Sequence, residues 1–470
     1  MSTTIHGKPA APVLGALMLS ALAFALLQTM VAPAIPHFAA EYDTTPATAT
    51  WVLTGFLLSA SVCTPLAGKL GDLFGKARVL TAVLVLFSAG AVICALAPTI
   101  EILIAGRVLA GTAGGVFPLA FGIINDELPA EKRSVAIGLM SAMFGIGGGI
   151  GMPLAGVIID ELHLSLLFWL GLMALPAAAA VWRYVPPSPK RERTSIDWAG
   201  AALLSAGLAT ILFAISRANA WGWGSPEFLV SMSAGVAILV LFVRLELRTD
   251  QPLVDIAVMR HRPVLATNAT GFLVGVAMFG SFILIPQFAQ TPESSGYGFG
   301  MTTTEAGLLM LPSAVTMLFA GPLGGALGTR IGFRATLMLG TVLAGLSFFL
   351  LGLAHGGAWE FVVAGVLMGA GISLSFASMA NLIVASVDPR EVGIATGINT
   401  VTRTVGGAFG SALVAALLAA ETIPGTPFPS EAAYTEGFIL SGIGAGLALA
   451  AAMAIPRVRG RVPQPAPAPA

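Results

Sequence analysis

One stretch organises the whole chain: Gly68-Lys-Leu-Gly-Asp72-Leu-Phe-Gly75-Lys76-Ala-Arg78-Val-Leu80. It is short and polar, and it separates two apolar segments, residues 51–66 and 80–96. Each segment is about as long as a helix that crosses the ~30 Å hydrocarbon core of a bilayer. The stretch therefore predicts a tight turn at a membrane surface, where glycines let two helix ends approach and the charged side chains reach carboxylates or lipid phosphates. A basic surface loop with no further role would explain the same residues.

The composition places the chain in a membrane. Of its 470 residues 56% are apolar and only 10% are charged, with a mean hydropathy of +0.89, whereas a soluble globular protein carries about 25% charged residues. The first apolar segment, residues 12–35, is too long for the core of a signal peptide, so we expect it to be the first transmembrane helix. Cys63 and Cys94 both lie in apolar segments, so neither a disulfide nor a cysteine-bound metal is expected.

Apolar segments separated by polar, Pro-bearing or Gly-bearing breaks predict fourteen transmembrane helices and an all-α polytopic membrane protein. If the N-terminus is cytoplasmic, all of the 23 Lys and Arg residues except Arg107, Arg217 and Arg403 fall in inside segments. The positive-inside rule therefore predicts a multi-pass protein of the plasma membrane with both termini in the cytoplasm. The expected helices span residues 12–35, 49–67, 79–97, 100–124, 134–158, 164–184, 198–216, 227–245, 264–287, 303–325, 335–354, 358–385, 391–420 and 437–456.

The chain also contains an internal repeat. Gly325 to Leu337 echoes the opening stretch, with Thr329 at the position of Asp72, and residues 389–397 echo residues 129–138. Two echoes at nearly one offset predict two parallel six-helix halves. The expected division is an N-terminal half, 1–184; a linker with two extra transmembrane helices, 185–262; a C-terminal half, 263–456; and a Pro-rich, disordered cytoplasmic tail, 457–470.

The opening stretch resembles the loop between helices 2 and 3 of the major facilitator superfamily, G-x-L-a-D-r-x-G-r-k-x-x-l. The six, two and six arrangement, together with Trp51-Val-Leu-Thr54-Gly-Phe56-Leu-Leu58, is similar to the 14-helix drug:H+ antiporter branch. This resemblance implies that Asp72 and Arg78 form a charge-relay contact that helps to hold the outward-facing state. The matching positions of the loop are Gly68, Leu70, Asp72, Gly75, Lys76, Arg78 and Leu80.

Glycines are dense in the fifth expected helix, residues 134–158. Small residues four apart allow close helix contact in a membrane, and a proline bends the helix. The run resembles the antiporter motif G-x-x-x-G-P-x-x-G-G, although the proline comes two residues after the last close-packed glycine. Helix packing alone would also explain Gly147, Gly151 and Pro153, which we assign to gating.

Two arginines lie inside expected spans. An unpaired charge there is costly and should face a cavity or a partner, so Arg107 and Arg403 are candidates for proton coupling or substrate contact. A structural Arg107, satisfied by helix-end carbonyl groups, is the alternative. The polar candidates for the central cavity, which could equally be hydrogen-bonding contacts between helices, are Gln28, Asn268, Gln287, Asn381 and Asn399.

The first helix departs from the antiporter pattern, which begins D-x-T-I-V-N-V-A-L-P. Leu27 stands where that pattern has its membrane carboxylate. Asp126 and Glu305, near the ends of the fourth and tenth helices, remain as possible proton carriers, together with Asp72. The missing acid therefore leaves two alternatives, export coupled to protons and export without coupling, and it removes the usual basis for a preference for cationic drugs.

These features predict a secondary active efflux transporter for amphipathic compounds, such as drugs or toxic metabolites, that works by alternating access. Its energy source would be proton antiport across the lipid bilayer, it would act as a monomer, and it would need no cofactor, metal or nucleic acid. The alternative is an exporter of an endogenous lipid or secondary metabolite with weak or no proton coupling. An enzyme is not expected, because the histidines are scattered at span ends and no nucleophile and base pair is evident.

Overall fold

The chain is a bundle of long helices. The computed structural model describes residues 4–5, 8–186, 197–249, 252–388, 391–426 and 428–456. Fourteen helical segments of this described part are long and apolar enough to cross a membrane, which confirms the expected number. The pairing of β1 (Thr4–Ile5) with β2 (Lys8–Pro9), two residues each, is the one sheet in this part of the chain.

The first ten α-helices and two 3-10 helices form the N-terminal part of the bundle. They are α1 (Ala10–Thr29), α2 (Ile35–Glu41), α3 (Pro46–Ala49), α4 (Trp51–Phe74), α5 (Lys76–Ala95), α6 (Ile100–Ala110), the 3-10 helix η1 (Gly111–Gly115), α7 (Val116–Glu127), α8 (Ala130–Glu161), α9 (Leu166–Trp169), the 3-10 helix η2 (Leu170–Met173) and α10 (Ala174–Tyr184).

The remaining helices begin with a pair that has no counterpart in the repeat. They are α11 (Trp198–Trp221), α12 (Pro226–Glu246), α13 (Ile256–Arg260), α14 (Arg262–Gln290), the 3-10 helix η3 (Glu293–Ser295), α15 (Thr303–Leu309), α16 (Leu311–Ile331), α17 (Phe333–Leu353), α18 (Ala358–Ser386), α19 (Val392–Ala420) and α20 (Glu431–Met453).

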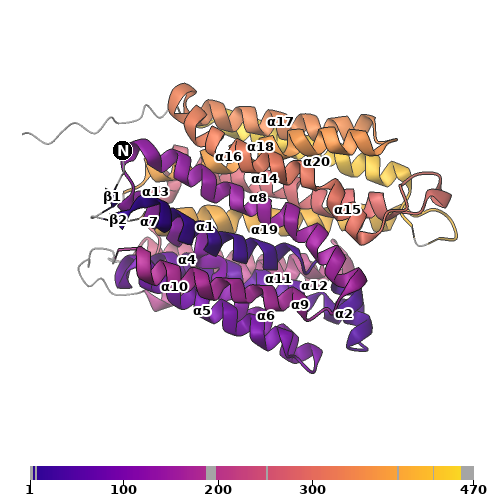
Figure 1. The fold of residues 1–470 in the computed structure, drawn as a ribbon, viewed down its shortest axis with the longest axis horizontal. Coiled ribbons are helices and arrows are strands. Elements are labelled where there is room, and N and C mark those ends of the chain that lie inside the picture. The colour runs from indigo at the N-terminus through magenta and orange to yellow at the C-terminus, as the bar shows by residue number, and fades with distance from the viewer. Residues whose placement is uncertain are drawn as a thin grey trace, which may run out of the picture.

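The early helices, by which we mean α1 to α10, and the late helices, α13 to α20, lie on opposite sides of the bundle. In Figure 1 the purple helices α5 and α6 are in the lower part of the view, and the orange helices α17 and α18 are in the upper part. Two long helices lie between them, α8 and α19. These two make the contacts that join the early helices to the late ones, because α8 packs along α16 and α19 packs against α4.

The opening stretch and its echo at residues 325–337 have the same backbone turn. Gly75 joins α4 to α5 with φ 96°, and Gly332 joins α16 to α17 with φ 93°. Both angles are in the region that L side chains rarely adopt, so glycine is needed at each turn. We call the end of the bundle that carries these two turns the inner end, since the basic residues predict that it faces the cytoplasm, and the opposite end the outer end.

Four expected spans are interrupted: the first, the fourth, the sixth at the 3-10 helix η2, and the tenth at Met310. The first ends at Thr29, before Pro33 and Pro36, and the chain continues as the short helix α2. The fourth changes to the 3-10 helix η1, where Gly111 and Gly114 lie directly against the backbone of α4. A side chain at Gly111 would come within 2.7 Å of the carbonyl oxygen of Phe56, so the glycines let the two helices touch.

The inserted pair, α11 and α12, lies beside the line along which α4 and α19 meet. Helix α11 contacts both α4 and α19. The ring centre of Trp51 in α4 lies 5.8 Å from that of Phe213 at a tilt of 34°, and the amide of Asn219 donates to the Ala412 carbonyl of α19 at 3.1 Å. Helix α12 is peripheral, since only 17% of its apolar 18-residue segment is buried inside the protein. It therefore presents most of its surface to the surroundings, as a lipid-facing helix would.

Candidate functional site

The inner end of the bundle is closed where α4 meets α19. A Cβ atom on Gly68 would lie 2.8 Å from the carbonyl carbon and oxygen of Gly393. One turn deeper, a Cβ on Gly397 would be 3.5 Å from the Cα of Pro65. Because backbone touches backbone across the seam, glycine at position 68 is required for this closed arrangement. We call this contact the inner gate.

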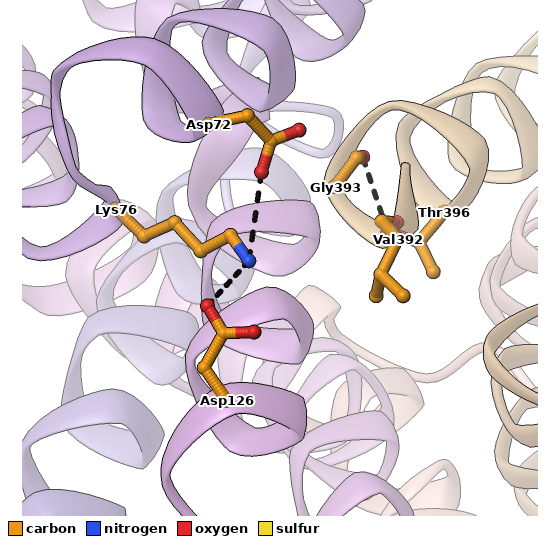
Figure 2. A network of polar contacts seen from close by, with 6 residues as sticks. All are labelled: Asp72, Lys76, Asp126, Val392, Gly393 and Thr396. Atoms are coloured by element: carbon orange, nitrogen blue, oxygen red, sulfur yellow. Dashed lines mark hydrogen bonds and ion pairs between the residues drawn. The ribbon is translucent and has the colours of Figure 1, made fainter. Parts of the chain in front are cut away.

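A buried lysine sits beside the gate between two carboxylates (Figure 2). Lys76 is 1% exposed, and its Nζ lies 2.6 Å from Oδ2 of Asp126 and 3.5 Å from Oδ1 of Asp72. Arg78, expected from the sequence to act with Asp72, is exposed instead. The difference has a simple cause: Lys76 follows Asp72 by four residues and reaches its carboxylate, whereas Arg78, two residues further along α5, is exposed.

Asp72 also faces the N-terminus of α19. Its Oδ2 is 3.4 Å from the position that a Cβ of Gly393 would take, and Gly393 is the second residue of this 29-residue helix. The partial positive charge at a helix N-terminus favours a nearby carboxylate. Asp72 therefore interacts both with Lys76 and with the opposing helix, and the latter interaction exists only while the gate is closed.

A third carboxylate at the gate was not anticipated. Glu391 precedes α19, and burial raises the pKa of its carboxyl group above the ordinary value. The negative charges of Asp255, Asp388 and Asp72 raise this pKa further, while Lys69 opposes them. Sequence spacing does not predict this group, because two of its three acidic neighbours, Asp255 and Asp72, come from distant segments of the chain.

The glycines of α8 face two different helices. Side chains at Gly147 and Gly151 would collide with Ala25 and Thr29 of α1, within the early helices. Gly145 and Gly149, which were not among the gating candidates, instead make room for Met317 and Ala314 of α16. We call this contact of α8 with α16 the second seam, and that of α4 with α19 the first. The seam continues inward to Gly138, against the Gly321 carbonyl group, and outward to Pro153, whose Cα would be 2.6 Å from a Cβ on Gly307. Helix α8 is therefore in close contact with the late helices over its whole length.

Between the two seams lies a small central cavity. It offers about 10 Å³ to the centre of a water molecule, which is on the order of one water. Its walls come from both parts of the bundle: Phe117, Phe121, Ser141, Phe144, Phe376, Ala380, Thr396, Asn399, Thr400 and Arg403. The closed inner gate and the small cavity together describe a state in which the central space is contracted.

Arg403 is the charged residue of this cavity. It is 8% exposed, and its guanidinium carbon lies 4.2 Å from the ring centre of Phe376 and 5.1 Å from that of Phe144. Since Phe144 belongs to α8 and Phe376 to α18, the cation sits between rings from both parts of the bundle. Cation–π contacts of this kind are worth ~0.5–2 kcal/mol, and they leave the hydrogen-bonding capacity of the guanidinium available to a ligand.

The predicted polar candidates divide into three groups. Asn399 lines the cavity and donates to Oδ1 of Asn268 at 2.9 Å. Asn381 donates to the Ala377 carbonyl of its own helix at 2.8 Å and to the Ser134 carbonyl of α8 at 3.5 Å, so it joins α18 to α8. Gln28 is buried in α1 with its Oε1 unpartnered. Gln287 does not line the central cavity as expected. It is exposed near the outer end of α14, at a hollow of about 540 Å³.

Arg107 is a fully buried link between three helices. Its Nε donates to the Val52 carbonyl at 3.0 Å, its Nη1 donates to the Leu27 carbonyl at 3.4 Å, and its guanidinium lies 4.1 Å from the ring centre of Phe56. Leu27 is 1% exposed and packs against Gly171, so the position of the missing acid also faces the interior of the early helices. These contacts favour the structural alternative for Arg107.

The remaining acidic candidates, Asp126 and Glu305, have partners outside the central cavity. Asp126 pairs with Lys76, as described above. Glu305 forms the capping box of α15, accepting from the backbone N–H of Thr302 at 2.9 Å, and it is exposed. Among the described residues, no Asp or Glu lines the central cavity, and no cluster of His, Cys, Asp and Glu has the makings of a metal site.

Comparison with known proteins agrees with this architecture. The family model of the Major Facilitator Superfamily matches residues 17–298 and 267–470. The chain belongs to this superfamily. A human member, the organic anion transporter MFSD10 (TETRAN), has a crystal structure that superimposes with a TM-score of 0.67 at 16% identity, covering 95% of this chain and all of that one. This likeness describes the fold.

Several bacterial relatives are more similar in sequence. A protein of Mycobacterium tuberculosis (strain H37Rv) named multidrug resistance protein B homolog is 29% identical over 391 residues, 80% of this chain and 70% of the relative. Multidrug resistance protein 3 of Bacillus subtilis (strain 168) is 25% identical over 82% of this chain and 75% of its own length. The B. subtilis transporter YhcA is 27% identical, and the match spans only 61% of its length. This major facilitator protein is thus a membrane transporter and not an enzyme.

Proposed function

We propose that this transporter exports amphipathic small molecules by alternating access of its early and late helices. The observation that carries the proposal is the central cavity, where Arg403 lies between Phe144 and Phe376 from the two sides of the bundle. A cation among aromatic rings suits a ligand with an apolar body and a polar or anionic group. Two relatives are named multidrug resistance proteins, which supports drugs or toxic metabolites as substrates.

The proposed cycle opens and closes the inner and outer ends of the bundle in turn. The inner gate at Gly68 and Gly393 would separate to admit substrate, and Asp72 would then lose its contact with the N-terminus of α19. The glycine contacts of α8 with α16 would serve as the pivot, since they run the length of the helix. We propose residues 1–184 and 263–456 as the moving halves, joined by the linker at 185–262, in a monomer of the plasma membrane with both termini in the cytoplasm. The proposed tail, 457–470, lies outside the described residues.

Protons would drive the export. The groups placed to respond are the carboxylates of the inner gate, Asp72, Asp126 and Glu391, rather than a carboxylate in the cavity. The second candidate function is export of an endogenous lipid or secondary metabolite without proton coupling, and it is favoured by Leu27 at the position of the missing acid.

Purified protein in liposomes with an imposed pH gradient separates the two functions. Uptake would be measured for three amphipaths of one size that are neutral, anionic or dicationic. Transport that collapses when the gradient is dissipated supports antiport, and transport indifferent to the gradient supports the second candidate. If none of the three compounds moves, amphipath export by this protein is wrong.

A further inference from the structure

Two carboxylates meet at the inner end of the inserted helix pair. Glu246 is the last residue of α12 and only 3% exposed, and Asp197 precedes α11. Oδ2 of Asp197 lies 2.7 Å from the point where a Cβ on Gly200 would stand, and Oε1 of Glu246 is nearer still to the same point. Both oxygens therefore border the same space beside Gly200, which has no side chain to fill it, and we call them the facing oxygens.

Neither of these two facing oxygens has a hydrogen-bond partner. Oε1 of Glu246 and Oδ2 of Asp197 are both buried and unsatisfied, whereas the other oxygen of each group accepts a backbone N–H: Val254 donates to Glu246 at 3.0 Å, and Gly200 donates to Asp197 at 2.8 Å. Two ionised carboxylates in this position would repel each other with nothing between them. A single proton between the facing oxygens would satisfy both at once.

The pair holds a segment that packs against the inner gate. Val254, which Glu246 fixes, and Leu253 are 2% and 1% exposed. They pack in one apolar cluster with Ile394 of α19 and Leu66 of α4, the two helices of the gate. Lys69 of α4 also donates to the Pro252 carbonyl at 3.0 Å. We call residues 252–256 the strap, because they lie across the inner seam.

We propose that Asp197 and Glu246 share one proton, and that this proton fastens the strap over the inner gate. Losing the proton restores the repulsion, moves Glu246 away from Val254 and loosens the strap. The charged groups that act on Glu246 are Asp197 of α11 and Lys69 of α4. Glu391, on the far side of Lys69, is a separate carboxyl group of the gate. The inference adds a proton site to the proposed function but does not need substrate transport to be tested.

The test measures how readily the covered face of the gate is exposed. Ile394 is 5% exposed beneath the strap, so Ile394→Cys reports strap opening by reaction with a membrane-impermeant maleimide in lipid nanodiscs. Every protein carries Glu391→Gln, which removes that group as a source of pH dependence. Each rate is divided by that of the same protein unfolded at the same pH, which cancels the intrinsic reactivity of the thiol, and the parent without the new cysteine gives the background.

We expect the corrected labelling rate to rise severalfold with pH, and by no more than about tenfold per pH unit, the limit for one proton. Glu246→Gln should hold labelling slow at every pH, since its amide can donate to Asp197. Asp197→Asn, which keeps the cap on α11, should do the same. Glu227→Gln, an exposed acid at the other end of α12, should leave the pH dependence intact.

Infrared spectra give a second readout, in which Glu246→Gln should remove one band of a protonated carboxyl group. The inference is wrong if the labelling rate does not change with pH in the protein that retains Glu246. It is also wrong if the Glu246→Gln variant keeps the pH dependence. Labelling that responds to a chelator overturns it as well, because the pair would then be a metal site. Export measured in liposomes is a separate result, so failure here leaves the proposed function standing.

Discussion

Replacing Gly68 by alanine should shift the transporter away from its closed inner gate. The new methyl group would lie 2.8 Å from the carbonyl carbon and oxygen of Gly393 and 3.0 Å from the backbone nitrogen of Ile394, where ordinary contacts begin at 3.4 Å. Backbone atoms cannot rotate aside as a side chain can. The two helices must therefore separate, and overpacking of this kind costs about 1–3 kcal/mol.

That cost applies only while the gate is closed, because α4 and α19 would part at this end when it opens. A difference of about 1–3 kcal/mol changes the ratio of closed to open molecules by roughly 5- to 150-fold. Spin labels at Arg78→Cys and Ile331→Cys, two exposed positions on early and late helices, would report this ratio as a distance distribution. We expect the longer distances to gain population and export to fall.

Two control substitutions separate gating from stability. Gly75→Ala meets no atom within 4 Å but is forced to φ 96°, so it should lower stability without moving the gate. Gly446→Ala meets nothing and should resemble the parent protein. If Gly68→Ala gives the parent's distance distribution and export rate, the closed gate is not the backbone contact described here.

Four further changes test the site. Asp72→Asn should reduce export with little change in melting temperature, because it weakens an interaction of ~0.3–1 kcal/mol with a helix N-terminus; parental flux at matched expression would contradict this. Arg107→Lys should lower the melting temperature, since a single ammonium group cannot replace two carbonyl hydrogen bonds worth ~1.5–3 kcal/mol each, and an unchanged melting temperature would argue against the structural role. Arg403→Gln should reduce export of an anionic amphipath relative to its neutral analogue, and a preference of the parent for the dicationic compound would refute the charge argument. The pKa of Glu391 is raised in the closed gate, so closure should be strongest below the open-state pKa and weaken as pH rises through the raised value; the spin-label distances should follow that trend, and Glu391→Gln should reduce it.

The sequence by itself determined the number of spans, the family and the position of the inner turns. Hydropathy sets the spans because every backbone group in the bilayer core must be satisfied within a helix, so each crossing needs a long apolar segment. The repeated Gly75 and Gly332 turns were recognisable because φ near 90° leaves glycine as the residue that fits. Both signals depend only on residues that are close together in the sequence, so they can be recognised without knowing the fold.

Only the tertiary structure decided which residues meet. Periodicity places Gly145 and Gly147 on different faces of α8, yet it cannot say that one faces α16 and the other α1. The sequence likewise offered Arg78 as the partner of Asp72, whereas the fold brings Lys76 and Asp126 together over fifty residues of chain. The pair of Asp197 and Glu246 was invisible for the same reason. The whole of α11 and α12 lies between these two residues in the sequence. Only the packing of the two helices, which depends on the shapes of all their neighbours, brings the carboxylates together.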